Sequence, residues 1–130
     1  MEKGSVDLIY NDFITKVKLQ DSRNEFGELD RVEDFDIPII LHDFYKYANP
    51  IDVEVTQEDF TSIKFYPASS LLNLQNEYDL PRDTFVFASR EGDPILLKGE
   101  KVYTAVHGVE KWDPKLLANS FDEFLGMLIS

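Results

Sequence analysis

Cysteine is absent from the 130-residue chain, and histidine and tryptophan are rare, with two copies and one copy respectively. The lack of cysteine excludes disulfide bonds and thiolate metal sites, and it is typical of proteins from a reducing compartment. The histidines, His42 and His107, lie far apart in the sequence and form no His-Glu-x-x-His or comparable metal-binding motif. The sequence therefore predicts no metal site, and we expect His107 to be a turn residue with local hydrogen bonds.

Long apolar segments are missing too. No run of the sequence approaches the roughly 20 apolar residues that a membrane-spanning helix requires. The N-terminal segment MEKGSVDLIYNDF carries acidic residues early and has no long apolar stretch, so it does not resemble a secretory signal. We therefore expect a cytoplasmic protein that does not bind membranes.

Basic residues are scarce: 13 Lys and Arg stand against 25 Asp and Glu, which gives a net charge of −12. Such a charge repels nucleic-acid phosphates and anionic lipid headgroups, so neither is an expected partner. It would instead speed association with a basic protein surface. A high acidic content also keeps many small proteins soluble, and the charge alone does not decide between these two roles.

Catalytic motifs are not found either. The sequence has no GxxxxGK[ST] phosphate loop and no GxSxG nucleophile elbow. Acidic residues do cluster at Glu58-Asp59, Asp122-Glu123 and residues 33–36, which a divalent cation or a carboxylate-dependent hydrolase could use. For Asp122 and Glu123 the simpler interpretation is stabilisation of a helix N-terminus. We predict no catalytic residue and no cofactor.

The apolar content of 43% is enough for the core of a single domain over residues 1–130. Residues 6–19 place Phe13, Val17 and Leu19 at near-helical spacing and predict a first helix. Residues 20–36 predict an acidic loop with at most one short helical turn. Pro38 opens a second predicted helix, which Asn49-Pro50 ends. The side of that helix expected to be buried consists of Leu41, Phe44, Tyr45 and Ala48.

The second half of the chain predicts a sheet. Two half-buried strands are expected around residues 53–55 and 63–66, followed by a third helix over residues 67–78. A three-stranded meander then follows, made of residues 84–88, 94–98 and 101–107, with Phe85 and Phe87 alternating with Val86 in its first strand. The resulting prediction is an α+β fold, in which helices pack against a mixed or antiparallel sheet.

A last helix is predicted over residues 121–129. Ser120 and Glu123 have the spacing of a capping box, in which each side chain satisfies a free backbone N–H of the other residue. The following apolar residues recur every three or four positions, so that one side of the helix should dock on the sheet. They are Phe121, Phe124, Leu125 and Leu128.

Residues 85–125, FVFASREGDPILLKGEKVYTAVHGVEKWDPKLLANSFDEFL, resemble the SUKH superfamily, which includes the Smi/Knr-type regulators of fungal cell-wall assembly. The family signature combines an apolar-Phe-Ala strand, a Gly-Asp turn, a later Trp, and a closing Ala-x-Ser-Phe-x-Glu-Phe-Leu helix. Upstream, Ala48-Asn49-Pro50 replaces the glycine-rich loop of that family. The matching positions are Phe87, Ala88, Gly92, Asp93, Trp112, Ala118, Ser120, Phe121, Glu123, Phe124 and Leu125.

The resemblance implies a SUKH-like fold and a non-enzymatic function. Many bacterial members look like immunity proteins that neutralise a cognate toxin, frequently a nuclease, by binding it, and fungal relatives look like interaction hubs. Together with the charge, this predicts that an acidic face of the chain covers the basic substrate groove of a toxin. The predicted contact residues are Asp52, Glu54, Glu58, Asp59, Glu91 and Asp93.

Other interpretations stay open at this point. The main alternative is a regulatory scaffold or small-ligand-binding module in cell-envelope control, in which a pocket between sheet and helices matters more than charge. Salt separates the two, because electrostatic capture weakens as the Debye length shortens and a buried apolar contact does not. For Trp112, packing of the meander against the last helix competes with a role as an anchor in a partner's pocket.

Overall fold

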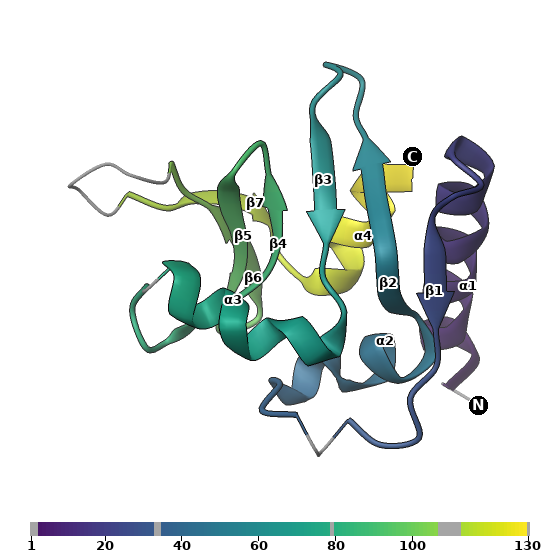
Figure 1. Ribbon diagram of the computed structural model, residues 1–130, viewed down its shortest axis with the longest axis horizontal. Helices are drawn as coiled ribbons and strands as arrows, with labels where there is room; N and C mark the ends of the chain where they lie inside the picture. Colours follow the sequence, from purple (N-terminus) through teal and green to yellow (C-terminus); the bar gives the residue numbers. More distant parts are fainter. Residues whose placement is uncertain (1–2, 33–34, 79, 107–112, 130) are drawn as a thin grey trace.

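The computed structural model describes residues 3–32, 35–78, 80–106 and 113–129. These residues form a seven-stranded sheet with four α-helices packed around it (Figure 1). Each strand pairs with the next strand along the chain, and each pairing is antiparallel. The predicted α+β class is confirmed, and of the mixed and antiparallel sheets that the sequence allowed, the described strands form the antiparallel one.

The elements follow the chain in a simple order. The helices are α1 (Lys3–Gln20), α2 (His42–Tyr47), α3 (Leu71–Tyr78) and α4 (Phe121–Ile129), and 3-10 turns at Ile39–Leu41 and Ala68–Ser70 precede α2 and α3. The strands are β1 (Glu25–Gly27), β2 (Asn49–Thr56), β3 (Ser62–Phe65), β4 (Thr84–Arg90), β5 (Asp93–Lys98), β6 (Lys101–Thr104) and β7 (Lys115–Ala118).

A cluster of aromatic rings holds the helices on one face of the sheet. Phe44 of α2 is at its centre, with its ring centroid 6.0 Å from that of Phe13 in α1 and 5.0 Å from that of Phe121 in α4. Phe65 and Phe87 supply the sheet side of the cluster, 6.2 Å apart. Most of these pairs are edge-to-face, a geometry that the ring quadrupole favours. α4 lies behind β2 and β3 in Figure 1, whereas α3 crosses the sheet in front.

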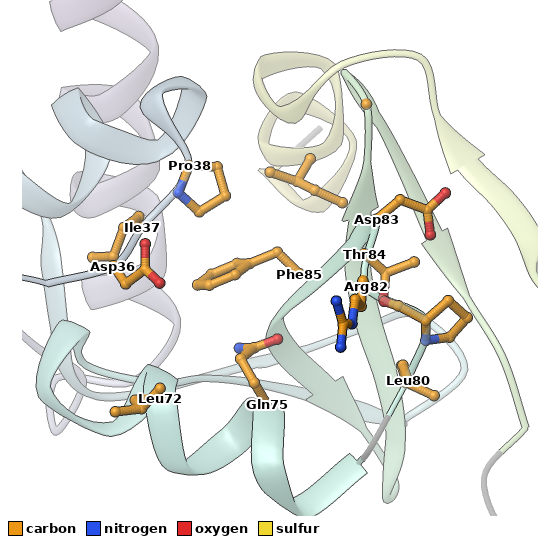
Figure 2. A pocket seen from close by; sticks show the side chains of 13 residues that line it. Asp36, Ile37, Pro38, Leu72, Gln75, Leu80, Arg82, Asp83, Thr84 and Phe85 are labelled. Atoms are coloured by element: carbon orange, nitrogen blue, oxygen red, sulfur yellow. The ribbon is translucent and has the colours of Figure 1, made fainter.

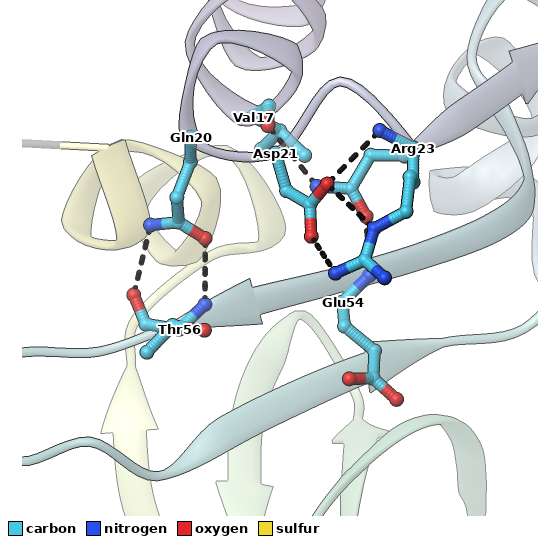
Figure 3. Close-up of polar contacts among 7 residues, drawn as sticks. Val17, Gln20, Asp21, Arg23, Glu54 and Thr56 are labelled. Carbon is cyan, nitrogen blue, oxygen red and sulfur yellow. Dashed lines mark hydrogen bonds and ion pairs between the residues drawn. The ribbon is translucent and has the colours of Figure 1, made fainter.

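Side-chain amides replace missing strand neighbours at two places. β1 pairs only with the first half of β2, and Gln20 at the end of α1 binds both the N–H and the C=O of Thr56 beyond it, at 2.7 and 2.9 Å (Figure 3). In the same way Gln75 of α3 binds the N–H and the C=O of Val86, at 2.7 and 2.6 Å, where β3 no longer reaches β4. At the buried Val86 the contacts satisfy backbone groups that would be costly to leave unpaired, whereas Thr56 is exposed.

The C-terminal helix begins at the predicted residue, but only one half of the predicted capping box is formed, because the Glu123 carboxylate binds the N–H of Asn119 and not that of Ser120. Ser120 Oγ accepts a hydrogen bond from the Glu123 N–H at 3.0 Å, and the Glu123 carboxylate accepts one from the N–H of Asn119 at 3.0 Å. Within the helix Phe121, Phe124 and Leu125 are buried. The predicted turn glycine Gly92 has a φ of +91°, and the predicted signature residue Phe87 is fully buried. Trp112 and His107 lie outside the described residues.

Several local predictions were wrong at strands and their edges. Residues 20–36 are not only a loop, because they contain the edge strand β1, and the strand β7 was not predicted at all. Both are short edge strands, and their burial does not alternate cleanly along the chain. The last predicted strand of the meander ends at Thr104, and the described residues Ala105 and Val106 are not part of it.

The expected alternation in β4 is also wrong. The register steps from Val86 opposite Leu96 to Ala88 opposite Ile95, so Phe87 is the extra residue of a β-bulge. The bulge lets Phe87 and its neighbours be buried together on both faces of the sheet. Leu19, expected in the apolar stripe of the first helix, is 80% exposed at the end of α1.

We predict that Tyr45→Phe leaves the protein as stable as the wild type or makes it more stable, by up to about 1 kcal/mol. The Tyr45 hydroxyl is fully buried and has no hydrogen-bond partner among the described residues, and its burial raises the pKa of the phenol. Urea denaturation measures the free energy of unfolding. Tyr47→Phe, at a partly exposed neighbouring tyrosine, is the control. A loss of more than about 1 kcal/mol for Tyr45→Phe would show that the hydroxyl is satisfied.

Candidate functional site

Two of the predicted contact residues, Asp52 and Glu54, are exposed on the outer face of β2. Val53 and Val55 alternate with them and are buried beneath the helices. The alternation follows from strand geometry, because successive side chains point to opposite faces of a sheet. Asp52 and Glu54 are called the strand face below.

Basic side chains partly neutralise the strand face. Arg23 interacts electrostatically with both Asp52 and Glu54, and Lys64 lies opposite Glu54 in the β2–β3 register. The guanidinium of Arg23 donates a hydrogen bond of 2.8 Å to Asp21 (Figure 3), and the hydrogen bonds from Arg23 lower the pKa of Asp21 to about 2. The strand face therefore carries less effective negative charge than its two carboxylates suggest.

Three further predicted residues meet at one end of the sheet. Glu58 and Asp59 lie in the β2–β3 turn, and Glu91 lies in the β4–β5 turn. The turns are neighbours, because the Glu91 carboxylate accepts a hydrogen bond of 3.0 Å from the backbone N–H of Ser62 at the start of β3. All three carboxylates are exposed. The tertiary structure thus joins acidic residues that are about 30 positions apart in the sequence.

An aromatic residue that was not among the predicted contact residues lies in the same turn as Glu58 and Asp59. Phe60 is 87% exposed, the highest value among the large apolar residues that the structure describes. The turn around it is closed by a hydrogen bond of 2.9 Å from the Phe60 N–H to the Gln57 C=O, and by one of 2.8 Å from the Gln57 N–H to the Thr61 C=O. We call Glu58, Asp59, Phe60 and Glu91 the turn surface.

Backbone strain concentrates on the turn surface. Phe60 has a φ of +69° and Glu91 a φ of +51°, and they are the only non-glycine residues with positive φ in the described ranges. A side chain in this left-handed region costs roughly 1–2 kcal/mol, because its Cβ comes too close to the following carbonyl oxygen. Strained residues of this kind cluster at functional sites more than elsewhere.

Asp59 is held in a fixed orientation. Its Oδ1 accepts hydrogen bonds from the Thr61 hydroxyl at 2.7 Å and from the Thr61 N–H at 3.1 Å. These bonds, and more weakly the positive charge of Arg90, hold the pKa of Asp59 below its ordinary value. The carboxylate is therefore ionised at neutral pH and cannot rotate freely.

The sixth predicted residue, Asp93, is placed differently. It is half-buried at the start of β5 and interacts electrostatically with Tyr78 of α3. Burial and then the neighbouring groups raise the pKa of Tyr78, whose hydroxyl donates a hydrogen bond of 2.7 Å to the Gly92 C=O. Asp93 thus lies beside α3, and it offers less carboxylate surface to a partner than the turn surface does.

A groove of about 700 Å³ lies between α3, the start of β4 and the segment before α2 (Figure 2). The ring of Phe85 extends into it, and the Asp36 and Arg82 side chains lie on either side of that ring. Neither Asp36 nor Arg82 is hydrogen-bonded or ion-paired to another described residue. The remaining lining of the groove is largely apolar and includes Ile37, Pro38, Leu72, Leu80 and Leu97.

Two further residues, Glu123 and His42, have local partners. Glu123 caps α4, and His42 Nε2 lies 2.8 Å from the Ile37 C=O. In the part of the chain that the structure describes, no group of three or more His, Asp or Glu side chains is arranged to hold a metal ion. The helices described are also all too short or too polar to cross a membrane.

Comparison of the chain with protein-family models, curated proteins and solved structures found no match. The resemblance to the SUKH superfamily thus stays a prediction. The candidate sites are the turn surface, the strand face and the groove. In the sequence, the one signal for Phe60 is an aromatic residue directly after two acids, between two strand-forming segments.

We predict that Phe60→Gly raises the free energy of unfolding by about 0.5–1 kcal/mol, because glycine removes the left-handed strain and little buried contact is lost. Phe60→Ala keeps the Cβ and should leave stability within about 0.5 kcal/mol of the wild type. Both are measured by urea denaturation.

Gly99→Ala is the matched reverse experiment. Gly99 has a φ of +63°, and a Cβ added there would have no neighbour within 4 Å, so its cost of about 1 kcal/mol measures strain alone. Destabilisation by Phe60→Gly would contradict the assignment of strain to Phe60.

Proposed function

We propose that this chain is a non-enzymatic, cytoplasmic binding domain that acts as an immunity protein and neutralises a cognate bacterial toxin by occlusion. The observation that carries the proposal is the turn surface, where an exposed aromatic ring and three exposed carboxylates lie in two neighbouring turns. The resemblance to the immunity-protein branch of the SUKH superfamily supports the same interpretation.

A toxin with a basic substrate groove suits this surface. Nucleases bind phosphates through Lys and Arg side chains, and a protein that presents carboxylates to those side chains competes with the nucleic acid. The net charge of −12 would steer such a partner toward the chain from a distance. The strand face extends the acidic area along β2, although Arg23 and Lys64 reduce its effect.

The test is affinity capture of the tagged protein from its own cells at about 0.1 M salt, with elution at about 1 M salt, where charge interactions are screened. We expect a stoichiometric basic protein that is toxic when expressed alone. The double variant Glu54→Lys/Glu58→Lys should bind this protein at least about tenfold more weakly at low salt. Neither side chain makes a hydrogen bond to a described residue, but Glu54→Lys places a like charge opposite Lys64, so urea denaturation is used to check that the double variant is folded.

Asp43→Lys/Glu100→Lys is the matched control, because it changes the net charge equally at exposed acids elsewhere. Equal affinity of both double variants for the partner would contradict the proposed surface. Capture of cell-envelope enzymes or regulators alone, or of no protein, would contradict the immunity function itself.

The groove favours a second function, a regulatory scaffold or small-ligand-binding module in cell-envelope control. Its volume of about 700 Å³ lies in the range of small-molecule sites, and the Phe85 ring with the charged side chains of Asp36 and Arg82 beside it is suited to an amphipathic ligand. In this case binding would depend on apolar contact with Phe85 more than on the turn surface.

Anilinonaphthalene sulfonate, an aromatic anion, is a probe for this alternative. If the groove binds amphipathic anions, dye fluorescence should rise on titration with the folded protein, survive about 1 M salt, and fall several-fold with Arg82→Glu. Lys101→Glu is the control at an exposed cation outside the groove. Equal dye binding by both variants would remove the support for this function.

A further inference from the structure

Phe60 has no role in the fold that accounts for its identity. Its side chain is 87% exposed, so it contributes little to the core. Its φ of +69° is a conformation that glycine adopts freely and phenylalanine adopts only at a cost. In the β5–β6 turn of the same sheet, Gly99 occupies nearly the same conformation, at +63°. A bulky aromatic ring is therefore retained at a position where stability favours its removal.

The ring is presented by a rigid turn. Hydrogen bonds between Gln57 and Thr61 close the base of the turn, and Asp59 is bonded to Thr61 within it. The contact from Glu91 to the Ser62 N–H fixes the turn against its neighbour. Pre-organisation of this kind lowers the entropic cost of binding, because the backbone of the turn is already ordered before a partner binds.

The surroundings of Phe60 define the chemistry of the partner. Glu58, Asp59 and Glu91 are all exposed, and Arg90 acts electrostatically on Asp59. A second copy of this chain would bring the same acids together and is disfavoured by repulsion, given the net charge of −12. A partner with an apolar pocket for the ring, and with Lys or Arg side chains at the rim of that pocket, would complement both the exposed ring and the acidic residues. Exposed aromatic residues ringed by polar groups have the anatomy of interface hot spots.

We propose that Phe60 is the anchor of the partner interface, and that it inserts into an apolar pocket rimmed by Lys or Arg side chains on the bound protein. This inference rests on the proposed binding function and deepens it, because it separates one apolar contact from the charge interactions around it. The anchor supplies affinity, and the carboxylates supply orientation and speed of association.

The experiment uses wild type, Phe60→Gly, Phe60→Ala and Ile39→Ala as parallel baits in the same capture. Ile39 is the control because it is a large apolar residue, 84% exposed, that lies in neither the turn surface nor the groove lining. The captured protein, purified after salt elution, is then the probe in calorimetric titrations at about 0.1 M and about 1 M salt. Urea denaturation of each variant shows that it is folded.

We expect both Phe60 variants to lose about 30-fold or more in affinity, by a similar factor at both salt concentrations. Ile39→Ala should bind as the wild type does. Phe60→Gly should combine this loss with unchanged or higher stability, which a purely structural residue would not do.

The outcomes separate the two proposals. If a basic partner is captured and both Phe60 variants bind it like the wild type, the anchor is wrong and the binding function stands. If the loss of affinity disappears at high salt, Phe60 only positions the acidic residues, and the proposed anchor role is again wrong. If no basic partner is captured by the wild type, the binding function fails, and the anchor falls with it.

Discussion

Aromatic packing on one face of the sheet is the interaction on which the rest of this structure depends. Phe44 links α1, α2 and α4 through Phe13 and Phe121, and Phe65 and Phe87 tie this cluster to the strands. Because these helices lie on one face, the opposite face of β2 and β3 stays in water. That exposure is why Asp52 and Glu54 can sit on the strand without a desolvation cost.

Backbone hydrogen bonding explains how short strands coexist with this core. β1 and β3 do not extend along the whole length of their neighbours, and Gln20 and Gln75 supply the missing donors and acceptors. The body of the sheet is thus satisfied, whereas the strain lies in the turns at one end, at Phe60 and Glu91. A rigid sheet that carries strained, exposed turns is a suitable frame for recognition, because loops held by a rigid scaffold commonly carry function.

The two candidate sites differ in their physical character. The turn surface is acidic and carries one exposed aromatic ring, which suits a protein partner. The groove is concave, with a mostly apolar lining that also carries Asp36, Asp83 and Arg82, which suits a small ligand. They involve different elements of the fold, so occupation of one does not require the residues of the other.

Local patterns in the sequence were enough to predict most of the fold. Helical spacing around Phe13 and Phe44, the alternation of Val53 and Val55, and the capping box at Ser120 each depend on neighbours a few positions away. The edge strands β1 and β7 and the bulge at Phe87 were not predictable, because they depend on pairing with distant strands.

The same distinction applies to the candidate site. Composition alone determined that the chain is acidic and lacks cysteine, and hence which partners its charge disfavours. Only the tertiary structure decided that Glu91 joins Glu58 and Asp59, that Asp93 is drawn toward α3, and that Phe60 is exposed. These facts depend on which turns meet at the end of the sheet and on the φ angle of Phe60. Neither can be inferred from the neighbouring residues in the sequence, because both depend on contacts between distant segments.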